Sequence, residues 1–165
     1  MSKAFTKDDD GDDLAVSPPL PPLPPGVPNY VTPEGAASLA AELKRLETEE
    51  RPALRRSDDA TARSRLAWVD ARIRALAERV DRVEIVRPPA DREVVRVGAW
   101  VRIDGEHGER EVRIVGLDEA DAAAGRISWR SPLATALVGA RVGDTVTLAS
   151  PRGETAVEIV AVRYG

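Results

Sequence analysis

The chain has 165 residues, a formal net charge of −4, and 32% charged against 42% hydrophobic residues, which suits one ordinary domain or two small ones. Cysteine is absent and His107 is the single histidine, which excludes disulfides and thiolate metal sites and argues against histidine zinc sites and a Ser-His-Asp triad. No apolar run approaches the length of a membrane span, and we expect a cytoplasmic protein that has no membrane contact and no cofactor of its own.

Residues 1–28 differ in composition from the rest of the chain. MSKAFTKDDDGDD is acidic and SPPLPPLPPGVP is proline-rich, a composition that forms polyproline II but cannot bury a core. We therefore predict a disordered tail over 1–28 that acts as a stiff spacer or as a ligand for an SH3-like domain. The tail supplies about −3 of the net charge, so the remainder is nearly balanced and lacks the basic patch of a free-standing DNA-binding protein.

Residues 29–86 have the pattern of two antiparallel helices. Thr32 can cap the first helix, with Pro33 at its first position. Apolar residues three or four apart mark one face of each helix: Leu39, Leu43, Leu46 and Leu54, then Leu66, Val69, Ile73, Leu76, Val80 and Val83. Pairing these two faces places the turn near 58–61. Pro52 should kink the first helix or remove one of its hydrogen bonds.

Residues 94–165 change to a period near two. Alternation from Val95 to Ile103 predicts a strand, a polar turn follows at 104–109, and a second strand resumes at 112–114. Further strands are predicted at 126–129, 145–148 and 156–162, with one short helix at 132–138. The sequence therefore predicts an α+β chain: a helical hairpin over 29–86, a linker over 87–93, and a small, mostly antiparallel β domain over 94–165.

Short segments spread over residues 29–164 match one known family in their order and spacing. They are 29–35, 50–52, 69–74, 114–116, 118–121, 127–128, 131–133, 136–137, 143–144 and 151–153. The chain resembles the Gre (GreA/GreB) transcription elongation factors of bacteria. This resemblance implies a coiled-coil hairpin followed by an FKBP-like C-terminal domain.

The resemblance also implies a partner and a mechanism. The C-terminal domain would dock on RNA polymerase at the rim of its secondary channel, and the hairpin would enter the channel. In full-length members an acidic tip helps to hold a second magnesium ion, and the polymerase then hydrolyses backtracked RNA by two-metal chemistry. Such a factor is not an enzyme. We expect a monomer whose contact with nascent RNA is indirect and occurs within the elongation complex.

The hairpin tip departs from the family pattern. Only residues 53–64 separate the two helical patterns, several turns fewer than usual, and this resembles the Rnk-type regulators of nucleoside diphosphate kinase. Asp58 and Asp59 are carboxylates at the new tip rather than matched positions, and they would cap the second helix or hold a metal ion. We expect a polymerase regulator that stimulates cleavage poorly. The alternative is an active cleavage factor in which Asp58 and Asp59 help to hold magnesium.

Two other regions are candidate contacts with the polymerase. Ser131 and Pro132 carry over from the family as docking residues, although they would also cap the short helix, and Arg130 stands where the family has an acidic residue. Trp68 lies on the flank of the hairpin, where it would be a hot spot for a partner or would pack on the β domain.

Arg65, Arg72 and Arg79 are spaced by seven and form a basic stripe on the second helix. The stripe would be a solvated face with ion pairs, such as one between Asp70 and Arg74, or a contact with acidic channel walls or RNA phosphates. A remote third function is prolyl isomerase or chaperone activity, as an FKBP-like domain suggests. The aromatic content of 4% argues against the aromatic-lined pocket that this activity needs.

Overall fold

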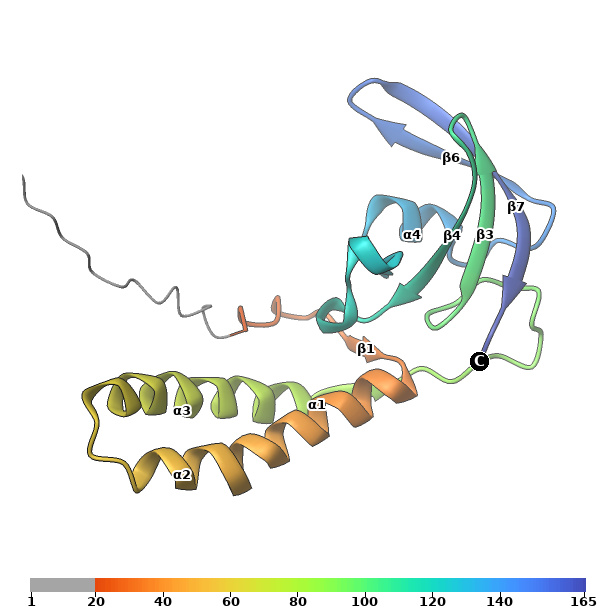
Figure 1. Cartoon of the computed structure of the whole chain (residues 1–165). Coiled ribbons are helices and arrows are strands. Elements are labelled where there is room, and N and C mark those ends of the chain that lie inside the picture. Colours follow the sequence, from red (N-terminus) through yellow and green to blue (C-terminus); the bar gives the residue numbers. More distant parts are fainter. Residues whose placement is uncertain (1–19) are drawn as a thin grey trace, which may run out of the picture.

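The computed structural model describes residues 20–165 and consists of a helical hairpin and a curled sheet (Figure 1). Residues 1–19, which hold the acidic run and most of the predicted tail, lie outside the described residues. In the part that the structure describes, no helix is both long and apolar enough to cross a membrane.

The hairpin has two arms that lie side by side (Figure 1). The first arm runs through α1 (Pro33–Arg45), a π-helical turn η1 (Leu46–Glu50) and α2 (Arg51–Arg55), and the second is α3 (Ala60–Asp81). The Thr32 hydroxyl accepts a hydrogen bond from the backbone N–H of Gly35 at 3.0 Å, which confirms the predicted cap. The turn occupies residues 56–59, close to the predicted 58–61.

Pro52 produces the predicted defect in the first arm. Proline has no N–H to donate, and the chain just before it widens into the π-helical turn η1, after which the N–H of Arg51 bonds to the carbonyl of Leu46. The arm remains helical through the proline, because α1, η1 and α2 follow one another without an intervening residue. Leu46 and Leu54, on either side of the proline, both still reach the interior of the hairpin.

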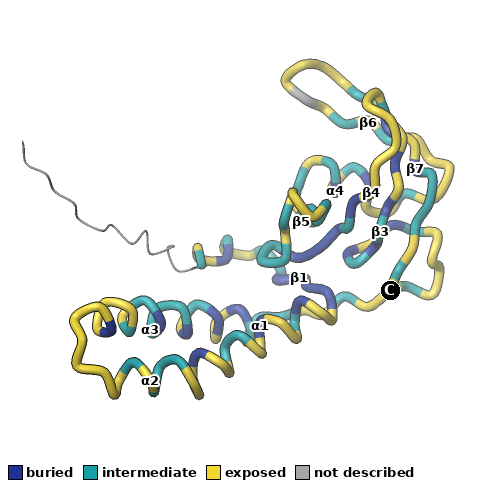
Figure 2. Tube along the Cα trace, viewed as in Figure 1, coloured by how far each residue is buried: buried dark blue, intermediate teal, exposed yellow. Residues whose placement is uncertain are grey.

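The hairpin interior is formed by the apolar stripes that the sequence predicts (Figure 2). Its buried members, called here the hairpin cluster, are Leu39, Leu46, Val69, Ile73 and Leu76 of the predicted stripes together with Val31, which precedes α1 and was in neither stripe. Burial of these side chains between the arms supplies most of the hairpin's stability, because isolated helices of this length are marginal in water.

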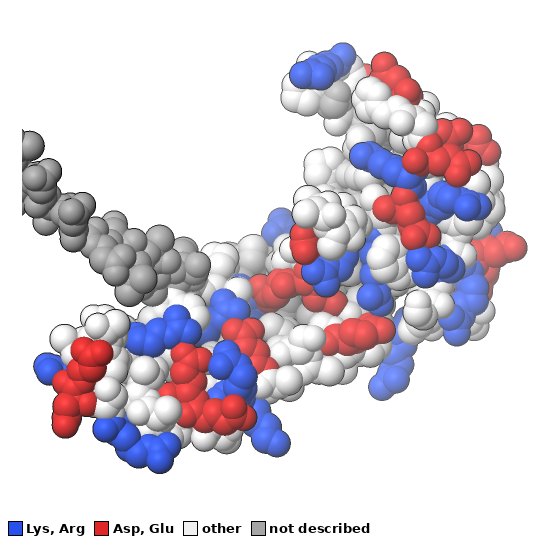
Figure 3. Space-filling model, viewed as in Figure 1, with Lys and Arg blue, Asp and Glu red and all other residues white. Residues whose placement is uncertain are grey.

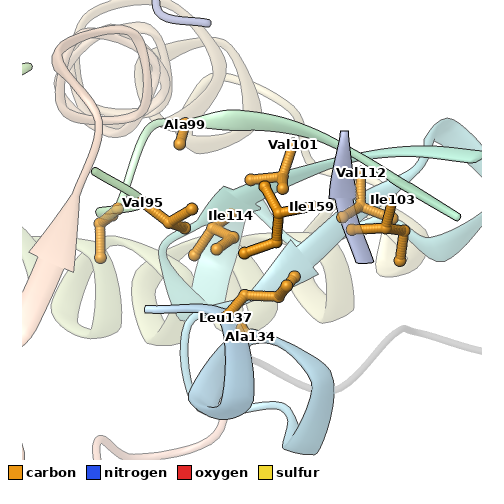
Figure 4. Close-up of a cluster of buried hydrophobic side chains, with 10 residues drawn as sticks. Val95, Ala99, Val101, Ile103, Val112, Ile114, Ala134, Leu137 and Ile159 are labelled. Atoms are coloured by element: carbon orange, nitrogen blue, oxygen red, sulfur yellow. The ribbon is translucent and has the colours of Figure 1, made fainter. Parts of the chain in front are cut away.

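The C-terminal half is a five-stranded sheet in the order β5-β4-β3-β7-β6. The strands are β3 (Trp100–Gly105), β4 (Gly108–Val115), β5 (Arg126–Ser128), β6 (Thr145–Ser150) and β7 (Gly153–Arg163). All neighbours are antiparallel except β4 and β5, which are parallel, so the sheet is mixed. The short helix α4 (Pro132–Leu137) lies against it and contributes Ala134 and Leu137 to the core (Figure 4).

The start of the first long strand differs from the prediction. Val95, Val97 and Ala99 are buried, as their alternation indicates, but regular pairing begins only at Trp100. Gly98 has φ 93°, a left-handed conformation that interrupts an extended strand. The alternation of apolar residues therefore predicted correctly which residues are buried, but it did not predict where the strand begins to pair.

A second, two-stranded sheet closes the base of the hairpin. β1 (Asn29–Val31) pairs in parallel with β2 (Val83–Ile85), and neither strand was predicted. Residues 20–28 also differ from the predicted disordered tail, because Leu23 is buried and Leu20 packs on the hairpin cluster. The predicted linker, 87–93, lies in an irregular stretch between β2 and β3.

Candidate functional site

The end of the hairpin carries the two aspartates that sequence analysis singled out. Asp59 occupies the N-cap of α3, and its carboxylate accepts a hydrogen bond from the N–H of Thr61 at 3.2 Å. Asp58 is exposed, and its backbone carbonyl accepts a 3.4 Å bond from Arg63. Within residues 20–165 no group of three or more histidine, aspartate or glutamate side chains could hold a metal ion. The geometry at Asp59 is therefore that of a helix cap.

Trp68 lies on α3 and is half-buried. Its ring packs against the hairpin cluster, and the guanidinium of Arg65 lies 4.3 Å from the ring centroid. The sequence left two roles open for Trp68, a binding hot spot for a partner and packing on the β domain. The structure shows instead that the indole packs on the hairpin's own core and is partly accessible.

The three arginines of the predicted stripe have different surroundings. Arg65 pairs with Glu50 at 2.7 Å, and Arg72 donates two hydrogen bonds to Glu42. Arg79 is only 3% exposed, so it is not part of any surface. Figure 3 shows acidic and basic side chains interspersed over this view of the hairpin rather than a continuous basic strip.

The suggested partner of Asp70 also differs. Asp70 pairs with Arg51 of the first arm at 2.8 Å, not with Arg74 on its own helix. Cross-arm pairs such as this one and Arg72–Glu42 join the two arms. Because both pairs are partly exposed, each adds on the order of 1 kcal/mol or less.

Residues 130–132 form an exposed loop in front of α4. The Ser131 hydroxyl accepts a hydrogen bond from the N–H of Ala134 at 3.2 Å, and Pro132 is the first helical residue. Ser131 is thus a helix cap, and this role leaves the exposed Arg130 and Pro132 side chains available to a partner. We refer to Arg130, Ser131 and Pro132 as the rim loop.

An apolar groove with a cavity of about 490 Å³ lies beside the rim loop. Tyr30 from β1 and Trp129 make a tilted ring contact in it, with centroids 5.1 Å apart and ring planes at 60°, and Val97 and Val138 add to the walls. The indole Nε1 of Trp129 is buried and has no acceptor among residues 20–165. The groove could not be predicted from the sequence, because its two rings come from distant segments that no local pattern connects.

The junction between the hairpin and the sheet contains a second set of polar contacts, carried by η2 (Leu117–Glu119). Asp118 pairs with the buried Arg79 of α3 at 2.8 Å. The Glu119 carboxylate accepts hydrogen bonds from the backbone N–H groups of Thr32 at 3.0 Å and Gly116 at 2.9 Å, and from the Thr32 hydroxyl. The two carboxylates and these partners are called here the clasp.

Glu34 and Arg113 add an outer ion pair to the same junction, with 3.2 Å between them. A hydrogen bond from its own backbone N–H lowers the pKa of Glu34 below its usual value, and Arg113 lowers it further. Sequence analysis noted residues 118–121 as a family motif, but no pattern in the sequence indicated that these acids bind the hairpin.

Comparisons with known proteins agree on one family. Residues 89–164 match the family model described as transcription elongation factor, GreA/GreB, C-term. The chain is 40% identical to transcription elongation factor GreA of Acidiphilium cryptum, with 82% of this chain and 97% of that protein covered. It is also 40% identical to GreB of Yersinia pestis, covering 82% and 89%. Among solved structures, the GreA factor homolog Gfh1 of Thermus thermophilus is 27% identical over 83% of this chain and 99% of that chain, with a TM-score of 0.39.

Proposed function

Because the chain belongs to the GreA/GreB family of transcription elongation factors, we propose that it docks at the secondary channel of RNA polymerase through the rim loop and the groove beside it. Gre factors bind RNA polymerase as accessory factors and are not enzymes. The exposed rim loop and the apolar groove together support a docking surface.

We further propose that the hairpin is a shortened one, of the kind found in the Rnk-type regulators. The match to the Acidiphilium cryptum protein extends over 152 residues but takes in 82% of this 165-residue chain, about 135 residues, so about 17 aligned positions have no counterpart here. Placed in the hairpin, they would lengthen each arm by about 8 residues, or about 12 Å. A metal-holding carboxylate tolerates far less displacement than this.

The cap at Asp59 is the observation that carries the proposal of poor cleavage stimulation. Its carboxylate is held against the N-terminus of α3, where the positive end of the helix stabilises it. A carboxylate engaged in this way is a weaker candidate for a ligand that has to reach into a partner's active centre. The protein would then occupy the secondary channel and alter elongation or initiation without supplying a metal ligand.

The alternative is a cleavage factor that uses Asp58 and Asp59. One observation favours it: Asp58 is exposed at the end of the hairpin, and its carboxylate has no partner among the described residues. Two neighbouring carboxylates, one of them uncommitted, could contribute to a magnesium site that the polymerase completes.

A backtracked RNA polymerase complex with magnesium separates the two proposals. Added protein should bind the complex but release no 3′ RNA fragments above the polymerase's own background. Fragments that appear with the wild-type chain and vanish with Asp58→Asn/Asp59→Asn would establish the alternative.

Docking at the groove can be tested with two variants of similarly exposed valines, one inside the groove and one outside it. Val138 lines the groove and is 39% exposed, whereas Val142 is 41% exposed and lies outside it. Val138→Asp should weaken polymerase binding by about tenfold or more, because it places a charge where an apolar partner surface would be buried. Val142→Asp should leave binding unchanged, and equal losses in both variants would refute docking at the groove.

A further inference from the structure

Glu119 attaches the sheet to the first arm of the hairpin. Its carboxylate takes hydrogen bonds from both the N–H and the hydroxyl of Thr32, the residue that caps α1, while the N–H of Gly116 holds it from its own segment. Gly35, in the first turn of α1, makes room for it: a Cβ at Gly35 would lie 2.1 Å from Cδ of Glu119. The carboxylate therefore occupies a place that only glycine leaves open.

Asp118 attaches the sheet to the second arm. Its carboxylate faces the guanidinium of Arg79 at 2.8 Å, with side-chain exposures of 9% and 3%. Arg79 also donates to the carbonyl of Pro21, and its own carbonyl accepts from the Asn29 side chain at 3.1 Å. A charge pair that is this well buried is costly to separate, because each ion would be left uncompensated.

The short strand β1 lies next to the clasp, because it ends at the residue before Thr32. Successive side chains of a strand point to opposite faces, so Tyr30 faces away from its buried neighbours Asn29 and Val31. Tyr30 meets Trp129, the residue that immediately precedes the rim loop. The base of the hairpin is thus held by adjacent carboxylates and, through Tyr30, touches the segment that carries the rim loop.

We propose that Asp118 and Glu119 are positioning residues that fix the direction in which the hairpin leaves the domain carrying the rim loop. One arm is held by each carboxylate, so the pair resists rotation of the hairpin as well as separation. The other polar side-chain contact between hairpin and sheet among residues 20–165, Glu34–Arg113, is too exposed to do this, with 62% of the Glu34 side chain accessible. The consequence for polymerase rests on the proposed function, but the orientation itself does not.

The chain has no cysteine, so two engineered cysteines report the orientation directly. Spin labels at Ser57→Cys in the hairpin turn and His107→Cys in the β3–β4 turn give a distance distribution by electron–electron dipolar spectroscopy. Both positions are exposed. The parent should give one narrow distribution, and Glu119→Gln and Gly35→Ala, which disturb the clasp from its two sides, should each give a broader or shifted one.

Glu111→Gln is the matched control, because it removes a surface ion pair with Arg163 on the same sheet and should leave the distribution narrow. Thermal melts confirm that each labelled variant is folded. A narrow, unshifted distribution in folded Glu119→Gln and folded Gly35→Ala would overturn the proposal.

A photo-crosslinker at Ser57 then tests the consequence in the polymerase complex. Glu119→Gln should keep its affinity for polymerase but spread its crosslinks from one site to several. If the parent fails to bind polymerase, the proposed function fails, whereas the distance distributions still decide whether the clasp fixes the hairpin. Unchanged crosslinks in a variant with a broadened distribution would refute the role in positioning on polymerase.

Discussion

Asp118 and Arg79 form an ion pair across the junction of sheet and hairpin, with 2.8 Å between Oδ2 and Nε and with both side chains almost inaccessible to water. This pair connects η2 to α3, two elements that no sequence pattern placed together. Its burial distinguishes it from most other ion pairs of the described residues, whose members are partly exposed.

Asp118→Asn should lower the free energy of unfolding by about 3–5 kcal/mol, because it leaves the buried guanidinium of Arg79 without a counter-charge. Glu111→Gln, which breaks an exposed pair, should cost about 1 kcal/mol or less. Urea denaturation measures both. Equal effects of the two substitutions would show that burial does not strengthen the Asp118–Arg79 pair.

Asp59→Ala should destabilise the protein by about 1 kcal/mol through loss of the α3 cap, whereas Asp59→Ser should keep most of the stability, because serine also caps well. Asp58→Ala should change the free energy of unfolding by no more than about 0.5 kcal/mol. The same urea titration distinguishes these outcomes. A larger loss at position 58 than at position 59 would contradict the assignment of the cap.

Tyr164→Phe should cost about 1 kcal/mol at pH 7, because the phenol donates to the carbonyl of Val94 at 2.6 Å and accepts from the N–H of Arg96 at 3.0 Å. Tyr30→Phe is the control, since the Tyr30 hydroxyl forms no hydrogen bond among residues 20–165. Its effect on the free energy of unfolding should be small.

Tyr164 should also make the stability of the protein depend on pH in the alkaline range. Burial raises the pKa of Tyr164 above its ordinary value of 10.0, so the folded state favours the neutral phenol. This contribution is fully present below the unfolded-state pKa and is lost as the pH rises from there through the folded-state pKa. Tyr164→Phe should therefore flatten the fall of the free energy of unfolding above pH 10. An unchanged slope of the free energy of unfolding against pH would contradict a role for Tyr164 in this fall.

Glu34 should make the stability of the protein fall at acidic pH. Its lowered pKa means that the folded state favours the carboxylate, so its contribution is present above the ordinary value of 4.5 and is lost as the pH falls through the folded-state pKa. Glu34→Gln should reduce the acid sensitivity of unfolding below pH 4.5. Glu47→Gln, at an exposed residue with no ion pair among the described residues, should retain the slope of the parent.

The sequence predicted those parts of the fold that repeat a local pattern. The apolar residues of α1 and α3 lie on one face of each helix, and pairing these two faces located the turn, because antiparallel helices leave little choice of register. β1 and β2 could not be predicted, since strands of three residues have no measurable period and their parallel partner lies across the hairpin.

The candidate site was predicted less well than the fold. Ser131 and Asp59 were recognised as possible helix caps, beside their other candidate roles, because a cap is a local arrangement of adjacent residues. Arg79 was placed in a surface stripe, because a spacing of seven identifies one face of a helix but not whether another element covers that face. Trp129 was overlooked for the same reason, since its neighbour Tyr30 is supplied by the opposite end of the chain.

Arg79 joins parts of the chain that leave the ribosome at different times. Its partners Pro21, Asn29 and Asp118 are 58, 50 and 39 positions away, two before it and one after. The hairpin can therefore assemble as soon as α3 is synthesised, but the arginine inside it lacks its carboxylate until the strand β4 and the segment after it have followed. The order of synthesis thus imposes an interval in which the helices can pair while Arg79 still lacks its counter-charge, and the synthesis of η2 ends it.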